Sequence, residues 1–334
     1  MSNLVEGRIT VGVPTRNRAG LLRRAVESVL SQEYPDVEVI VSDNASTDRT
    51  VECMEEVGDP RLRLLRQHEN VGMIANFNNC LQNATGEFFL MLSDDDVLEP
   101  GALARFADAF HSPPDGIESR DIGLVWCPCT IVSAEGDTLW VSDKGPAVEK
   151  SASLVAGLLD GSRGPRFSGI LVRTTDAITV GGYEPSHGAL CDIGNWMRIA
   201  VQYPFAVCVP EPLVRYTMHQ TSTTSKSTGS EWQEAAENVH RDLLAALRER
   251  GDGAGELLIR RRKTAFLTNM IVTVLMQRMG KAGWVRYAFR EVLRAPRYFF
   301  NTCLVARLIR DGWKLLPLRN PQRAKRCEPA TARI

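Results

Sequence analysis

Long apolar segments are missing from this 334-residue chain. Its longest apolar window runs from residue 265 to residue 276 and is interrupted by Thr268, Asn269 and Thr273. A helix that crosses a bilayer needs about 20 mostly apolar residues, so this window is too short and too polar to span one. We therefore expect a soluble or peripheral protein.

The cysteine patterns of disulfide frameworks and zinc sites are missing as well. The eight cysteines are scattered, none forms a Cys-x-x-Cys pair, and the first residues, MSNLVEGRIT, do not resemble a secretory signal. Cys127 and Cys129 fit two half-buried strand positions better than a metal site. Scattered thiols in a chain of this size are typical of a reducing compartment, so we expect a cytoplasmic location.

The net charge of the whole chain is zero, but the charges are unevenly distributed along it. Residues 248–334 contain 20 Lys and Arg against 6 Asp and Glu, a charge of +14, so residues 1–247 carry −14. The basic tail, from Arg260 to Arg297, has aromatic residues among its arginines. This pattern fits interfacial helices at the inner face of a membrane, and it equally fits helices packed on a domain with a solvated basic face. The aromatic residues would also suit a homodimer contact. No nucleic-acid module accompanies the charge, so no nucleic-acid partner is expected.

A glycine-rich phosphate loop is also missing. The first predicted strand, residues 9–13, leads into Pro14-Thr15-Arg16-Asn17-Arg18, which contains no glycine. A dinucleotide-binding dehydrogenase needs a Gly-x-Gly-x-x-Gly turn at this place, so that class is excluded. A nucleotidyltransferase usually cradles its triphosphate in a similar loop, which counts against that class.

The apolar pattern that is present alternates between strands and helices. Strands are expected at residues 9–13, 37–41, 62–65 and 88–92, and helices at 19–32, 46–56 and 76–83. This alternation predicts an α/β fold with a mostly parallel, doubly wound sheet. Ligands bind such sheets beyond the carboxyl ends of the strands, where the polar residues after strands one, two and four would meet.

Three consecutive carboxylates, Asp94, Asp95 and Asp96, end the fourth predicted strand. Neighbouring carboxylates raise one another's pKa, so such a cluster ionises together only when cations or strong donors compensate it. Hard divalent cations take oxygen ligands and share them with substrate phosphates. A solvated acidic turn is the alternative. The convergence of polar residues at one sheet edge favours a site for Mg²⁺ or Mn²⁺ with a nucleotide.

Several ordered motifs within residues 8–220 resemble the family 2 glycosyltransferases, which have the GT-A fold. The motifs that carry the resemblance are VGVPTRNR at 11–18, VIVSDNASTD at 39–48, Asn70-Val71-Gly72, Asn76-Phe77-Asn78, Gly86-Glu87 and LSDDD at 92–96. Enzymes of this family use nucleotide-sugar donors and mostly invert the anomeric centre. The resemblance therefore implies an inverting glycosyltransferase.

The resemblance also implies which residues bind the donor. Nucleotide-sugar contacts carry over to Pro14, Thr15, Arg16, Arg18, Asp43, Asn76, Asn78, Asp94, Asp95 and Ser222. Asp43 would accept a hydrogen bond from the base, although an Asx turn after the strand is the structural alternative. Arg18 would lie near the diphosphate.

Metal ligands and a general base are implied in the same way. Asp94, Asp95, Asp96 and His219 would hold the metal, but Ser93 replaces the first acid of the usual motif, so the exact ligand is open. In the acceptor segment Asp192 corresponds to the general base, and Cys191 replaces the acid that usually precedes it. A helix N-cap is the alternative role for Asp192.

The resemblance divides the chain into three parts: a nucleotide-sugar-binding half at 1–112, an acceptor-binding half at 113–220 and a basic helical region at 221–334, with helices expected at 232–250, 256–279 and 284–293. The acceptor would be a saccharide, a lipid-linked saccharide or a small molecule. Two alternatives stay open: a degenerate protein that binds nucleotide sugar without turnover, which Ser93 and Cys191 would allow, and a nucleotidyltransferase.

Overall fold

The computed structural model describes residues 4–114, 116–218, 229–263 and 266. All of them belong to one compact unit, which spans residues 1–271. Its centre is an eight-stranded sheet with the strand order β3-β2-β1-β4-β10-β6-β11-β9. The strands are β1 (Val5–Thr15), β2 (Val37–Asp43), β3 (Leu62–Arg66), β4 (Gly86–Met91), β6 (Ile122–Trp126), β9 (Val148–Lys150), β10 (Ile170–Arg173) and β11 (Phe205–Cys208).

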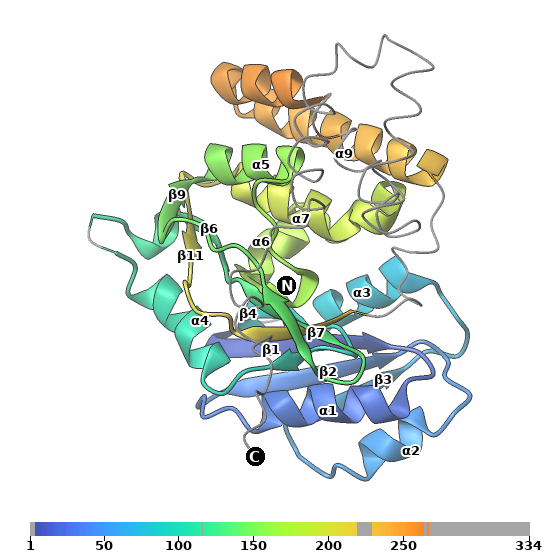
Figure 1. Ribbon diagram of the computed structural model, residues 1–334. Helices are drawn as coiled ribbons and strands as arrows, with labels where there is room; N and C mark the ends of the chain where they lie inside the picture. The colour runs from blue at the N-terminus through green and yellow to red at the C-terminus, as the bar shows by residue number, and fades with distance from the viewer. Residues whose placement is uncertain (1–3, 115, 219–228, 264–265, 267–334) are drawn as a thin grey trace, which may run out of the picture. The chain divides into compact units, whose positions relative to one another are not determined.

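The first four strands of this order are parallel, as the sequence predicts. Their apolar runs are continuous because both faces of the sheet are covered. Figure 1 shows α1 (Ala19–Leu30) and α2 (Thr50–Glu55) against one face and α3 (Met73–Gln82) against the other. Gly12 allows the close approach of α3, since a Cβ at this position would lie 2.8 Å from the Cβ of Cys80.

The second half of the sheet is mixed. Strand β10 is antiparallel to both β4 and β6, so the parallel order ends at β4. A separate four-stranded sheet has the order β5-β12-β7-β8. Its strands are β5 (Val97–Leu98), β7 (Cys129–Ser133), β8 (Thr138–Val141) and β12 (Val214–Met218). Because β5 directly follows the acidic run and pairs with β12, this second sheet brings a distant segment to the end of β4.

Helices cover the rest of this unit. They are α4 (Ala102–His111), α5 (Ser151–Asp160), α6 (Thr174–Thr179), α7 (Cys191–Ala200) and α9 (Gly229–Glu249), with 3₁₀ turns at Ser119–Asp121, Phe167–Gly169 and Pro185–Leu190. Residues 253–263 are also helical and lie beside α9. In the described part of the chain, no helix is both long and apolar enough to cross a membrane.

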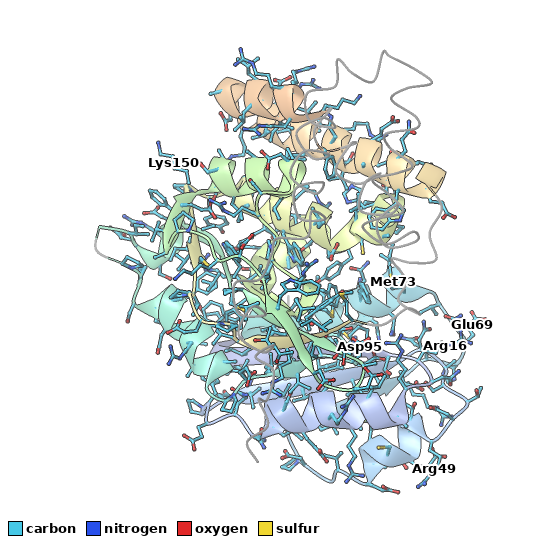
Figure 2. All side chains as sticks on the ribbon, in the orientation of Figure 1. Arg16, Arg49, Glu69, Met73, Asp95 and Lys150 are labelled. Atoms are coloured by element: carbon cyan, nitrogen blue, oxygen red, sulfur yellow. The ribbon has the colours of Figure 1, made fainter. Side chains whose placement is uncertain are left out.

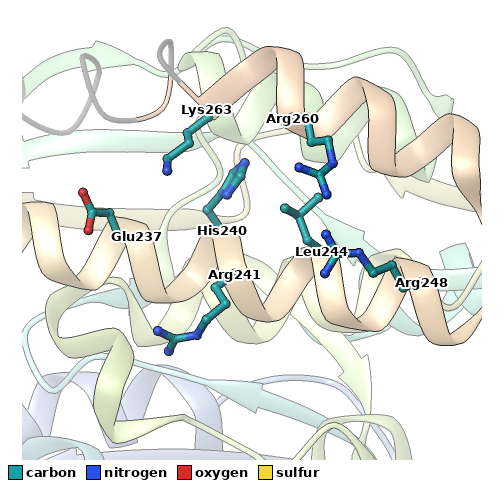
Figure 3. Close-up of a pocket in the computed structure, with 7 residues that line it drawn as sticks. All are labelled: Glu237, His240, Arg241, Leu244, Arg248, Arg260 and Lys263. Carbon is teal, nitrogen blue, oxygen red and sulfur yellow. The ribbon is translucent and has the colours of Figure 1, made fainter.

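A hollow of about 340 Å³ lies between α9 and the helix at 253–263 (Figure 3). We call it the basic hollow, because most of its lining side chains are cationic. The lining residues are Glu237, His240, Arg241, Leu244, Arg248, Arg260 and Lys263.

The predicted elements of the first half are all present, with shifts at their ends. The second helix begins at Thr50 instead of residue 46, because residues 46–49 form a loop that binds Asp43 and Asn17. The third helix begins three residues earlier than predicted, at Met73, and the first ends two residues earlier, at Leu30. The last two predicted helices fall mostly or wholly outside the described residues, as do the aromatic residues of the basic tail from Trp284 onward.

Candidate active site at the end of β4

Asp94 and Asp95 share one cation in the turn after β4. The Nη1 of Arg18 lies 2.9 Å from one oxygen of Asp94 and 2.8 Å from one oxygen of Asp95. The hydroxyl of Thr15 donates to the other oxygen of Asp94 at 2.8 Å, and the hydroxyl of Ser93 donates to Asp95 at 2.6 Å. The predicted convergence of β1 and β4 at one edge is therefore real, and it fixes both carboxylates.

Asp96 is held differently, because it is completely buried. The hydroxyl of Ser168 donates to one of its oxygens at 2.5 Å, and the backbone N–H of Thr217 donates to the other at 2.9 Å. The N–H of Ser93 in turn donates to Ser168, and the hydroxyl of Thr217 donates to the carbonyl of Asp95. Asp96 therefore ties the turn to the segment before β10 and to β12. This geometry favours Asp94 and Asp95 over Asp96 as metal ligands.

Among the described residues, the turn has three carboxylates and one guanidinium, that of Arg18, paired with two of them. Burial raises the pKa of Asp94, and the neighbouring Asp95 raises it further, while Arg18 opposes both effects. Burial raises the pKa of Asp96 strongly, and Asp95 adds to the shift. A hard divalent cation would relieve this excess, and carboxylate oxygens are the ligands it prefers. The donor set and the charge therefore fit Mg²⁺ or Mn²⁺. Within the described residues no group of three or more acidic, Cys or His side chains forms a ready metal cage.

Two of the predicted ligands, His219 and Ser222, lie outside the described residues.

Asp43 lies at the end of β2, in register with Thr15 of β1. Its side chain is fully buried, and both of its oxygens accept from the N–H of Ser46, at 3.2 and 3.3 Å. The carboxylate therefore holds the following loop through the N–H three residues on, whereas the Asx turn of the structural alternative would use the N–H two residues on. The same loop binds Asn17, whose N–H donates to the hydroxyl of Ser46 and whose side chain accepts from the N–H of Thr47. These hydrogen bonds join the loop after β1 to the loop after β2.

Asn76 and Asn78 use their amide groups inside the protein. Asn76 donates to the carbonyl of Ser42 and accepts from its hydroxyl, which fastens α3 to β2. Asn78 forms a reciprocal pair with the backbone of Tyr183, accepting and donating at 2.8 Å. The close pairing explains Gly182, where a Cβ would lie 2.5 Å from the Oδ1 of Asn78. Both asparagines thus position the fold, and their contact with a nucleotide stays a prediction.

Pro14 and Arg16 complete the predicted set on β1 and its loop. Pro14 is buried opposite Ser42 of β2. Arg16 is exposed beyond the strand end (Figure 2), so its side chain is free to meet a ligand from solvent.

Asp192 lies in the first turn of α7. The N–H of Ile193 donates to its carboxylate at 2.7 Å, and among the described residues no Lys, Arg or His forms an ion pair with it. Burial raises the pKa of Asp192 to about 6, and the hydrogen bond from Ile193 opposes this shift. The preceding Cys191 is a buried thiol whose pKa burial raises strongly. A carboxylate with a pKa near the working pH suits proton transfer.

Tyr216, which was not among the predicted residues, is influenced electrostatically by carboxylates of both the acidic turn and Asp192. Burial raises its pKa to about 12, the carboxylates of Asp96, Asp95 and Asp192 add to this shift, and Arg166 opposes it. The phenol therefore lies in the electrostatic field of both the acidic turn and Asp192. We call the four carboxylates of Asp94, Asp95, Asp96 and Asp192 the acidic site.

Three further residues were missed: Arg166, Ser168 and Thr217. The sequence signal for them is weak, because 161–170 is a short stretch rich in Gly, Ser and Arg, without periodicity. Thr217 lies two residues before His219, and the histidine is the residue of this segment to which the resemblance assigns a role. Only the pairing of β12 with β5 and β7 brings it to Asp96.

Comparison with known proteins places the sequence near one family and several relatives. Residues 10–119 match the sequence model of the family described as glycosyl transferase family 2. An uncharacterized protein of Mycobacterium tuberculosis, MT1568, is 27% identical over 65% of this chain and 69% of its own length. A GalNAc(5)-diNAcBac-PP-undecaprenol beta-1,3-glucosyltransferase of Campylobacter jejuni is 41% identical over 29% of this chain. The match spans only 32% of that glucosyltransferase.

Solved structures share the fold. Residues 1–349 of TarS from S. aureus, in complex with UDP-GlcNAc, superpose with a TM-score of 0.58 at 16% identity, covering 91% of this chain and 92% of that one. The mannosyltransferase PcManGT from Pyrobaculum calidifontis, in complex with GDP-Man and Mn²⁺, gives 0.52 at 19% identity, covering 94% and 88%. The fold is therefore that of the GT-A glycosyltransferases, as predicted. Together with the match over residues 10–119, this supports the resemblance of the chain to the family 2 glycosyltransferases.

Proposed function

We propose that this glycosyltransferase moves a sugar from a nucleoside-diphosphate sugar to an acceptor by a single, inverting displacement that a divalent cation assists. The observation that carries the proposal is the acidic site itself. The carboxylates of the acidic turn, two of which Arg18 bridges, and the carboxylate of Asp192, with a pKa of about 6, both act electrostatically on Tyr216. One displacement needs these two functions and no enzyme nucleophile.

On the donor side, the loops after β1 and β2 bind the nucleotide. Asp43 lies at the base of the nucleotide, and Arg16 lies at its phosphates. Asp94 and Asp95 would hold the cation, and Arg18, which bridges both carboxylates, would interact with the diphosphate of the donor. A bound Mg²⁺ or Mn²⁺ supplies Lewis-acid neutralisation of the leaving diphosphate. Arg18 adds fixed positive charge where negative charge develops.

On the acceptor side, Asp192 takes the proton of the attacking hydroxyl group. The carboxylate has no competing cation among the described residues, so its basicity is not suppressed. Its pKa of about 6 leaves it mostly ionised at neutral pH and still basic enough to accept a proton. The N–H of Ile193 holds one oxygen in place and leaves the other for the acceptor.

Asp96, by contrast, acts as the anchor of the turn.

His219 and Ser222 keep their proposed roles at the metal and the diphosphate. The division at residues 112 and 220 also stays a proposal, although strands of both halves share one sheet. The name of the Campylobacter relative supports a lipid-linked saccharide as the first acceptor to test. Membrane contact through the basic tail would suit such an acceptor.

The donor site can be tested by thermal shift with UDP, dTDP and GDP, each with and without Mn²⁺. A ligand that binds only the folded protein stabilises it by about 2.7 kcal/mol at a hundredfold excess over Kd. We expect one nucleotide to stabilise the protein in a metal-dependent way. Asp95→Asn should abolish this effect, and Asp108→Asn on the exposed side of α4 should keep it. No metal-dependent shift with any nucleotide would contradict the proposal and favour the degenerate alternative.

The stereochemistry is tested separately, with the nucleotide sugar that binds. Proton NMR of the transferred sugar should give the anomeric configuration opposite to that of the donor. A product with the donor's configuration would exclude a single displacement.

A further inference from the structure

Arg166 carries a buried hydrogen-bond donor that has no acceptor. It directly precedes the 3₁₀ turn Phe167–Gly169, and its Nε is inaccessible to solvent and forms no hydrogen bond. Among the described residues no carboxylate lies within ion-pair distance of its guanidinium. Buried donors are almost always satisfied in native proteins, so an orphaned one indicates a missing partner such as an ion or ligand.

Position makes this orphan informative. The guanidinium carbon of Arg166 lies 5.5 Å from the centroid of the Tyr216 ring. Ser168, two residues after Arg166, binds Asp96, and so does Thr217, the residue after Tyr216. The two segments that fix the acidic turn are therefore the ones that present Arg166 and Tyr216. Arg166 thus lies beside the two segments that hold the acidic turn.

Arg173 shows how a structural arginine looks in the same protein. Its guanidinium also stacks on aromatic rings, 5.0 Å from the centroid of Phe110 and 5.5 Å from that of Tyr203. It donates, however, to the carbonyl of Ile122 at 2.7 Å and lies 3.6 Å from Asp176. Arg166 has the same stacking without the acceptors. Ring packing alone therefore does not account for it.

We propose that Arg166 binds a phosphate group of a substrate at the transfer centre; this inference rests on the proposed function. Its planar fork of donors matches phosphate oxygens, and stacking on Tyr216 holds the plane in place. The phosphate comes either from the donor diphosphate or from a phosphate on the acceptor. If Arg166 only compensated the charge of the nearby carboxylates, its positive charge would suffice and the hydrogen-bond donors of its guanidinium would have no acceptor.

Three variants separate these roles. Arg166→Gln removes the charge and the fork, Arg166→Lys keeps the charge, and Arg120→Gln, an exposed arginine that pairs with Glu118, is the matched control. In one arm, titration calorimetry in the presence of Mn²⁺ measures the affinity for the nucleoside diphosphate that stabilises the protein. In a second arm, it measures the affinity for inorganic pyrophosphate, with and without saturating nucleotide. Melting curves establish that each variant folds.

If the phosphate belongs to the donor, Arg166→Gln should weaken nucleoside-diphosphate binding roughly 10- to 100-fold, and binding of the bare nucleoside should not change. If it belongs to the acceptor, nucleotide affinity should stay at the wild-type value, while pyrophosphate binding to the nucleotide complex weakens by the same factor. Arg166→Lys should recover only part of either loss.

Wild-type affinity of Arg166→Gln in both arms would overturn the inference, and full recovery by Arg166→Lys would reduce Arg166 to a compensating charge. Failure of the proposed function has a different signature. In that case the wild-type protein binds no nucleotide, and the pyrophosphate arm without nucleotide still decides whether Arg166 binds phosphate.

Discussion

The acidic site and the basic hollow are two clusters of like charge that the protein handles in opposite ways. In the acidic site the three carboxylates of the turn are at least nine-tenths buried, and each meets fixed donors from different parts of the chain. In the basic hollow, Arg248 and Arg260 are about half exposed and pair with a single shared carboxylate, Glu256. Both are clusters, but only the first is built into the core.

The difference teaches where charge carries function. Like charges that face water are screened, so their arrangement costs little and specifies little. Like charges that are buried away from water repel strongly and are tolerated only when hydrogen bonds satisfy them. Asp96, for example, accepts hydrogen bonds from Ser168 and Thr217. A site that holds this unfavourable charge is ready to bind a cation and to move a proton. The following predictions test this contrast.

The largest effect is expected for Asp192→Asn, which removes the proposed base. Asparagine cannot accept the proton, so the turnover rate should fall about 10²- to 10⁴-fold while nucleotide affinity is retained. In the wild-type enzyme kcat/KM should rise with pH up to about pH 6 and then level off, because Asp192 must be ionised. Steady-state rates from pH 4.5 to 8 check both points. Full turnover of Asp192→Asn would rule out this role.

Ser168→Ala should produce the largest loss of stability. The change leaves the buried Asp96 without one partner and the N–H of Ser93 without its acceptor, which costs about 3 kcal/mol. Urea unfolding measures it, and Ser162→Ala, an exposed position in the same segment, is the control. Equal stability of the two variants would mean that the acidic turn tolerates loss of its partners as the hollow does.

Asp192→Asn should also make the protein more stable at neutral pH. The folded-state pKa of Asp192, about 6, is above its ordinary value, so the folded protein favours the protonated form. That favourable contribution is complete below about pH 4 and is lost as the pH rises to 6. Asparagine carries no such penalty, so the variant should gain about 2 kcal/mol at pH 8 and almost nothing at pH 4. Unfolding curves at the two pH values check this. A gain that does not depend on pH would contradict the raised pKa.

The smallest effect is expected in the basic hollow, for Glu256→Gln. The variant removes the carboxylate that pairs with Arg248 and Arg260, but both arginines are about half exposed to water, so the melting temperature should fall only slightly. The remaining difference should disappear in 1 M salt. A loss as large as that of Ser168→Ala would show that exposure does not separate the two clusters.

Much of the site was accessible to sequence reasoning because it follows local patterns. Asp43, Asp94 and Asp95 each end an apolar strand, and parallel strands bring such ends to one edge. The roles of Asn76 and Asn78 were harder to foresee, because an amide binds a nucleotide or a backbone equally well. Only the observed pairs with Ser42 and Tyr183 show that these amides are engaged in the fold.

By itself, the sequence determined the alternation of strands and helices, the parallel first half, the acidic turn and the family. These are properties of residues close together in the chain, where periodicity and motif spacing act directly. Only the tertiary structure decided that Asp96 is an anchor, that the Nε of Arg166 has no hydrogen-bond acceptor among the described residues, and that Asp95 and Asp192 both raise the pKa of Tyr216. Burial and hydrogen bonding at those positions depend on segments more than 70 residues apart, and no local pattern encodes which of them will meet.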